Sequence, residues 1–146
     1  MIRSIRKDVD PSLSGCLPES SILIVAKRVL IVDDNETVRR SLHSLIEMDS
    51  AFEVCGAAEN GREAIEVAGL TLPDLVILDL AMPVLDGLQT APMLIKTLPG
   101  VIVILFTGFE APHLAEEAHR AGVHAVISKS RPDRLLEHAR SFLNVQ

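Results

Sequence analysis

The sequence predicts an α/β domain in which helices cover both faces of one parallel sheet. From residue 28 onward, short apolar runs rich in β-branched residues alternate with segments of helical period, and this alternation is typical of parallel sheets. The chain has 146 residues, of which 48% are hydrophobic and only 3% aromatic. A chain of this length forms one substantial core. Leu, Ile, Val and Ala are the usual filling of such a sheet.

Five strands are expected, and each is followed by a helix. The strand candidates are short, apolar and rich in Val, Ile and Leu: 28–33, 52–58, 74–79, 101–106 and 123–128. The segments between and after them place apolar residues at helical spacing, as in Val38, Leu42 and Leu45 after the first strand. We therefore expect five consecutive βα units.

Capping residues predict several helix ends. Asn60 with Glu63, and Ser130 with Asp133, have the spacing of a capping box and predict the starts of the second and fifth helices. Gly122 predicts the end of the fourth helix.

The pattern is weakest in two segments. Pro92 falls inside the third helix unless its regular turns begin near Thr90, because proline lacks the backbone donor of a helix interior. Residues 1–26 are rich in Pro, Ser and Gly and predict a flexible N-terminal tail, which leaves 27–146 as the folded domain.

The composition argues against several classes of function. A net charge of −6 argues against direct nucleic-acid binding by this chain, because Lys and Arg supply most of the affinity for phosphates. Cys16 and Cys55 match neither a disulfide framework nor a zinc spacing, which fits a reducing cytoplasm. The apolar run 22–26 is too short to span a membrane, and we expect neither a secretion signal nor a membrane anchor.

Polar residues stand where the predicted strands end. Asp33 and Asp34 follow the first strand, Asp79 the third, Thr107 the fourth and Lys129 the fifth. In a doubly wound sheet, ligands bind beyond the carboxyl ends of the strands. We therefore expect three acids, a hydroxyl and an ammonium to converge on one rim.

Such a rim favours phosphoryl chemistry with a metal ion. If the first and third strands are neighbours, their ends lie about 5 Å apart, and the carboxylates of Asp33, Asp34 and Asp79 repel unless a cation or a proton is bound. Mg²⁺ prefers such oxygen ligands, and a carboxylate beside it can attack a phosphoryl group to give an aspartyl phosphate. Lys129 would then balance the phosphoryl charge, and the Thr107 hydroxyl would bind one of its oxygens.

Each of these residues also has a structural interpretation. Asp34 has the position of a helix cap, Thr107 of a turn residue and Lys129 of a solvated lysine. Asp79 is harder to explain in this way, because a charge at the end of a strand buried on both faces is costly unless it is paired or functional.

Four motifs in this order resemble the receiver domain of bacterial two-component response regulators. They are RVLIVDDNE (28–36), LVILDLAMPVLDG (75–87), VILFTG (103–108) and ISKS (127–130), and the resemblance covers roughly 27–144. It implies a flavodoxin-like, doubly wound sheet of five parallel strands in the order 2-1-3-4-5 with five helices. That order is a known example of the strand-end rule.

The resemblance also implies roles for the rim residues. Asp79 would accept a phosphoryl group from a phosphohistidine of a sensor kinase or phosphotransfer protein. Asp34, Asp79 and the carbonyl of Ala81 would ligate Mg²⁺, and Asp33 would act through a bound water.

Four residues would contact the phosphoryl group itself. The resemblance implies that Thr107 and Lys129 bind its oxygens, together with the backbone of Gly108 and of Ala81. The result would be a phosphoacceptor switch with at most weak self-dephosphorylation, rather than an enzyme.

The sequence departs from the family at two positions. Ser130 stands where the family usually has proline, and Val126 stands where it usually has an aromatic ring that rotates on activation. The output face, roughly residues 110–143, is expected to bind a partner or a second copy, and the coupling of this face to the site is expected to run through Thr107 and its loop. Residues 52–65 and 128–139 look most like receivers that precede a helix-turn-helix DNA-binding domain.

Two alternatives to a stand-alone switch remain open. A phosphatase of the haloacid dehalogenase type also uses Asp, Thr, Lys and Mg²⁺, but it needs a second Asp two residues after the nucleophile, where this chain has Ala81. The chain also fits a receiver cut from a longer DNA-binding regulator.

Overall fold

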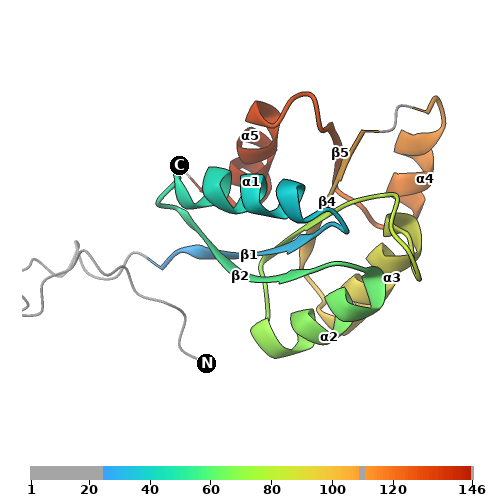
Figure 1. The fold of residues 1–146 in the computed structure, drawn as a ribbon, viewed down its shortest axis with the longest axis horizontal. Coiled ribbons are helices and arrows are strands. Elements are labelled where there is room, and N and C mark those ends of the chain that lie inside the picture. Colours follow the sequence, from blue (N-terminus) through green and yellow to red (C-terminus); the bar gives the residue numbers. More distant parts are fainter. Residues whose placement is uncertain (1–24, 109–110, 146) are drawn as a thin grey trace, which may run out of the picture.

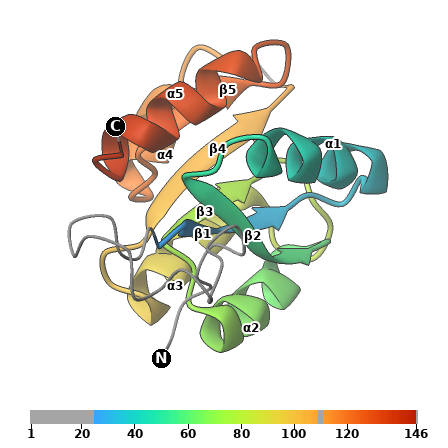
Figure 2. The same cartoon turned by 90° about the vertical axis from the view of Figure 1, so that its left-hand side faces the viewer.

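A computed structural model describes residues 25–108 and 111–145 of the chain. Residues 1–24 of the predicted tail lie outside these ranges. Within them, one sheet lies between two layers of helices (Figures 1 and 2). None of the described helices is long and apolar enough to cross a bilayer.

Five strands alternate with five helices within the described residues, as the sequence predicts. In chain order they are β1 (Lys27–Val32), α1 (Glu36–Glu47), β2 (Phe52–Ala58), α2 (Gly61–Thr71), β3 (Leu75–Leu78), α3 (Gly87–Thr97), β4 (Ile102–Thr107), α4 (Leu114–Arg120), β5 (Ala125–Ser128) and α5 (Asp133–Phe142).

The strands are all parallel and have the order β2-β1-β3-β4-β5, which confirms the predicted topology. Val32 of β1 pairs with Leu78 of β3, and Leu78 pairs with Leu105 of β4. The carboxyl ends of β1 and β3 are therefore level, β4 continues two residues further to Thr107, and the residues that follow these strands share one edge of the sheet.

The sheet separates two apolar cores. Leu42 and Leu135 represent the core under α1 and α5, whereas Ala64, Leu94 and Leu114 represent the core under α2, α3 and α4 (Figure 1). All four residues of β3 are buried, because this central strand packs against both layers. The apolar run before Asp79 is thus the centre of the fold.

Several predicted helix ends are confirmed. The Asn60 side chain accepts the backbone N–H of Glu63 at 2.9 Å at the start of α2. Gly122 follows α4 with a φ of +91°, a left-handed conformation that favours glycine. At the start of α1 the capping side chain is Asn35, so the interpretation of Asp34 as that helix's cap is wrong.

The predicted cap of the last helix is wrong. α5 begins at Asp133 with Pro132 at the N-cap position, and no side chain caps it. The fixed φ of proline suits a helix start, and its missing N–H costs nothing there. Ser130 instead donates its backbone N–H to the Ser128 hydroxyl at 3.2 Å, which closes a turn before the helix.

The third helix begins earlier than expected. Asp86 and Gln89 form a capping box, with reciprocal contacts of 2.8 and 3.0 Å, that starts α3 at Gly87 rather than near Thr90. Pro92 lies inside the helix and removes one donor from it. The early cap decides the helix start despite this loss.

Candidate functional site

The sheet ladder continues one residue past the strand ends and holds two acids side by side. The Asp33 N–H donates to the Ala58 carbonyl at 3.1 Å, and the Asp79 N–H donates to the Val32 carbonyl at 2.9 Å. Asp33 is 1% exposed and Asp79 is 5% exposed. Both carboxylates are therefore fixed at their backbones and almost removed from water.

Three carboxylates converge at this edge. One oxygen each from Asp33, Asp34 and Asp79 lies within 4.8 Å of the others, and only Asp34 is exposed. This confirms the predicted convergence of the acids. It also creates a concentration of negative charge that is unfavourable without a cation.

Lys129 supplies one positive charge to the cluster. Its Nζ lies 2.8 Å from Asp33 Oδ2 and 3.2 Å from Asp79 Oδ1. The Lys129 N–H also donates to the Thr107 carbonyl at 2.9 Å, which ties the lysine to the end of β4. The interpretation of Lys129 as a solvated surface lysine is therefore wrong.

The charges of the cluster shift the pKa values of two groups. Burial, and then the neighbouring charge of Asp33, raise the pKa of Asp79 against the opposing effect of Lys129. Burial opposes the charge of Lys129, but the hydrogen bond to Asp33 and the charge of Asp79 outweigh it and raise the pKa of the ammonium. One ammonium thus faces three carboxylates, and negative charge remains in excess.

The donor set fits a hard divalent cation. The Oδ2 atom of Asp33 is buried, and within the described part of the chain its one partner is the Lys129 ammonium. Asp34 offers an exposed carboxylate at the mouth of the cluster. Two buried and one exposed carboxylate suit Mg²⁺, which binds few protein oxygens and keeps water as further ligands.

The remaining predicted site residues lie around the same rim. Thr107 is the last residue of β4 and is 1% exposed, and Gly108 follows it at the surface. Ala81 is exposed in the loop after Asp79. A Cβ built on Gly87 would lie 2.5 Å from the Asp79 carbonyl oxygen, so the Asp-Gly pair of this loop needs glycine for close packing.

Comparison with known proteins identifies the chain. The family model described as "Response regulator receiver domain" matches residues 29–140. The chain belongs to this family. This receiver is 34% identical over 102 residues to the transcriptional regulatory protein LnrK of Bacillus subtilis, covering 70% of this chain and 46% of LnrK. It is 35% identical over 105 residues to the chemotaxis protein CheY of Halobacterium salinarum, covering 72% of this chain and 86% of CheY.

Solved receiver structures have the same fold. The response regulator domain of Thermotoga maritima CheB gives a TM-score of 0.75 at 29% identity and covers 83% of this chain and 98% of that domain. A LuxR-family response regulator from Aurantimonas sp. SI85-9A1 gives 0.77 at 27% identity, covering 82% and 86% of the two chains. The chain spans about half the length of several regulatory proteins that it matches, including LnrK.

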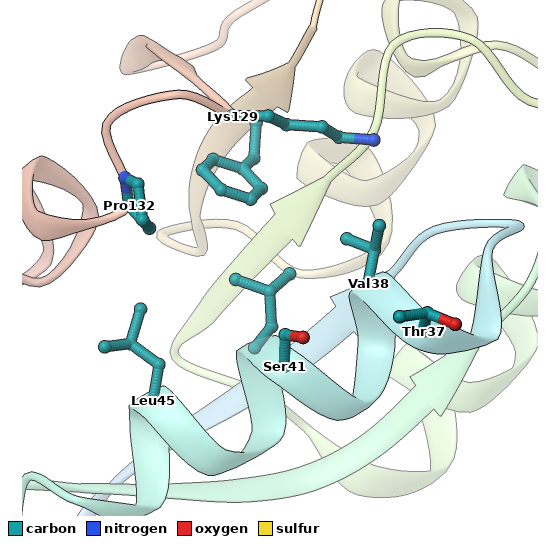
Figure 3. A pocket seen from close by; sticks show the side chains of 8 residues that line it. Thr37, Val38, Ser41, Leu45, Lys129 and Pro132 are labelled. Carbon is teal, nitrogen blue, oxygen red and sulfur yellow. The ribbon is translucent and has the colours of Figure 1, made fainter.

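An apolar cavity adjoins the receiver's acidic cluster. It has a volume of about 370 Å³ and lies between α1 and the loop that leads into α5 (Figure 3). Figure 3 shows Lys129 along one side of it, with the ammonium at the end away from Pro132. Val38, Leu45 and Phe106 supply much of its apolar lining. Lys129 therefore borders both the cavity and the acids.

Sequence reasoning assigned no role to Arg39, which contacts the site from α1. Its Nη1 donates to the Asp33 carbonyl oxygen at 2.6 Å. The sequence signal for this contact was the position of Arg39, six residues after Asp33 and in the first turns of the helix that begins between them. The spacing alone does not reveal that such a long side chain folds back to the preceding loop.

Proposed function

We propose that Asp79 accepts a phosphoryl group from a phosphohistidine and that its phosphorylation changes a partner-binding or dimerisation surface of this receiver. Phosphorylation-dependent signalling is the general role of receiver domains. The observation that carries the proposal is the position of Asp79, buried at the end of the central strand and 3.2 Å from the Lys129 ammonium. Membership of the receiver family also argues against the alternative of a haloacid dehalogenase-type phosphatase.

The proposed step is a transfer between two proteins. A carboxylate oxygen of Asp79 forms a bond to phosphorus while the phosphorus–nitrogen bond to the donor imidazole breaks, and the electron pair of that bond stays on the nitrogen. Lys129 balances the charge that arrives. Asp34, Asp79 and the Ala81 carbonyl, with Asp33 through a bound water, would hold Mg²⁺, which would supply positive charge to the phosphoryl oxygens.

The response would begin at the end of β4. The Thr107 hydroxyl and the backbone N–H of Gly108 bind phosphoryl oxygens, and Thr107 transmits the change to the output face, residues 110–143. Val126 on β5 pairs with Leu105 of β4 and has no aromatic ring to rotate. Coupling therefore runs through Thr107 and the loop that follows it.

The donor would dock beside the acids. The cavity bordered by Val38, Phe106 and Lys129 lies next to the phosphoacceptor and is mostly apolar, so an apolar side chain of the phosphohistidine-bearing protein fits there. Such a donor, a sensor kinase or a phosphotransfer protein, would meet the chain in the cytoplasm.

Acetyl phosphate tests the acceptor without a kinase. With Mg²⁺, the parent protein gains one phosphoryl group by intact mass, and Asp79→Asn gains none. Asp86→Asn is the matched control, because Asn caps a helix about as well as Asp does and α3 should keep its start. If Asp79→Asn is labelled as well as the parent, the assignment of the acceptor is wrong.

A further inference from the structure

The Asp33 carbonyl lies beyond the hydrogen-bond ladder of the sheet. β1 ends at Val32, so the last β1 carbonyl that the sheet uses belongs to that residue, which accepts the Asp79 N–H. The next carbonyl, that of Asp33, is bound instead by the Arg39 guanidinium at 2.6 Å. A charged donor this close makes a stronger hydrogen bond than a neutral one.

This contact fixes the peptide unit that carries Asp34. The Asp33 carbonyl and the Asp34 N–H belong to one rigid plane, so a bond to the oxygen sets the direction in which Asp34 leaves the strand. On either side the loop is already held: the Asp33 side chain accepts the Asn35 N–H at 2.9 Å, and the Asn35 side chain caps α1. Asp34 is exposed, and the side chain of Arg39 provides the missing restraint.

We propose that Arg39 is a positioning residue for divalent-cation binding, because it holds the Asp33–Asp34 peptide in the orientation that brings the Asp34 carboxylate within 4.8 Å of Asp33 and Asp79. The proposal rests on the proposed function, which assigns these carboxylates to Mg²⁺. It makes Arg39 part of the support of the metal site, although the residue carries the same sign of charge as the ion.

The positive charge of Arg39 allows a positioning effect on metal binding to be distinguished from a purely electrostatic effect. Removing a cation near three carboxylates would, by Coulomb attraction alone, strengthen the binding of Mg²⁺. Loss of a positioning contact has the opposite sign, because outer-shell partners of metal ligands typically contribute about 10–100-fold to metal affinity. The direction of the change in affinity therefore separates the two explanations.

The test compares neighbouring arginines on α1. Arg39→Met removes the contact and keeps a good helix former. Arg40→Met removes the same charge from a side chain that is 79% exposed and pairs with Glu36. The chain has no Trp and no Tyr, so bound Mn²⁺ is measured by electron paramagnetic resonance and then displaced by Mg²⁺. Circular dichroism melts in chelator report whether each variant folds.

We expect Arg39→Met to bind both ions about tenfold more weakly, and Arg40→Met to change affinity less than about twofold. The Mg²⁺ concentration for half-maximal phosphorylation by acetyl phosphate should rise in Arg39→Met, whereas the rate at saturating Mg²⁺ is retained. Arg39→Lys keeps a donor and the charge, and should recover part of the affinity.

Three results would overturn the proposal. Unchanged or tighter binding in Arg39→Met, with normal binding by the parent, refutes the positioning role alone. An equal loss in Arg40→Met shows that the loss does not depend on the contact of Arg39 with the Asp33 carbonyl. A parent protein that binds no divalent cation refutes the proposed metal site, and the role of Arg39 with it.

Discussion

Replacing Asp79 by asparagine should stabilise the metal-free protein. At an effective dielectric constant of about 20, two carboxylate oxygens within 4.8 Å of each other repel by at least about 3.5 kcal/mol. The Lys129 ammonium at 3.2 Å attracts by about 5 kcal/mol. Two repelling neighbours, Asp33 and Asp34, and one attracting neighbour leave Asp79 with a net cost of about 2 kcal/mol. Burial adds to this cost, whereas solvent around the exposed Asp34 reduces it.

The pH dependence has a defined sign. Burial and the charge of Asp33 raise the pKa of Asp79 in the folded protein. The ionised side chain therefore destabilises the fold above this raised pKa, and the fold regains stability as the pH falls toward the ordinary Asp value of about 3.9. The advantage of Asp79→Asn should be largest at neutral pH and should disappear near that ordinary value.

Thermal melts followed by circular dichroism at 222 nm measure this effect. In chelator at pH 7, Asp79→Asn should melt roughly 5–10 °C above the parent for a gain of about 2 kcal/mol. Added Mg²⁺ should raise the melting temperature of the parent more than that of the variant, because it removes the repulsion. A variant that melts below the parent in chelator at pH 7 would refute the electrostatic reasoning.

Three other changes have expected outcomes. Lys129→Met leaves Asp33 and Asp79 buried without their cation. It should therefore lower the melting temperature in chelator and slow phosphorylation by acetyl phosphate at least about tenfold. An unchanged rate would exclude Lys129 from the reaction. Gly87→Ala should lower the free energy of unfolding in urea by about 1–3 kcal/mol, because the added Cβ would meet the Asp79 carbonyl. The control Gly69→Ala, whose added Cβ would meet nothing within 4 Å, should be neutral or stabilising. Equal effects of the two substitutions would contradict the close packing at Gly87. Ala81→Asn should shorten the lifetime of the phosphorylated form, because a polar side chain can hold the attacking water and about 1.4 kcal/mol of barrier is tenfold in rate; an unchanged loss of label over time would show that this position does not set the lifetime.

The sequence was sufficient where one local signal acted alone. The apolar run 75–78 predicted a strand buried on both faces, and the structure confirms this strand. The prediction was clear because no capping or turn residue interrupts the run. The convergence of Asp33 and Asp79 followed from parallel topology, which places strand ends at one edge.

Prediction failed where two local signals competed or where a long side chain reached back. Ser130 had the spacing of a cap, but α5 begins two residues later than this spacing predicts, with Pro132 at the N-cap position. Pro92 suggested a late start for α3, but the Asp86 capping box decided it. The contact of Arg39 with the Asp33 carbonyl depends on rotamers that residue spacing does not encode.

Asp79 is the residue on which we propose that this receiver carries its phosphoryl group. Borohydride reduces an aspartyl phosphate to an alcohol and leaves a free carboxylate intact, so it marks the acceptor chemically. Protein phosphorylated by a phosphohistidine donor is reduced, digested and mapped by mass spectrometry. We expect a reduced carboxyl carbon at Asp79 in the parent protein and none in an unphosphorylated control. Reduction at another residue, with Asp79 unmodified, would contradict it.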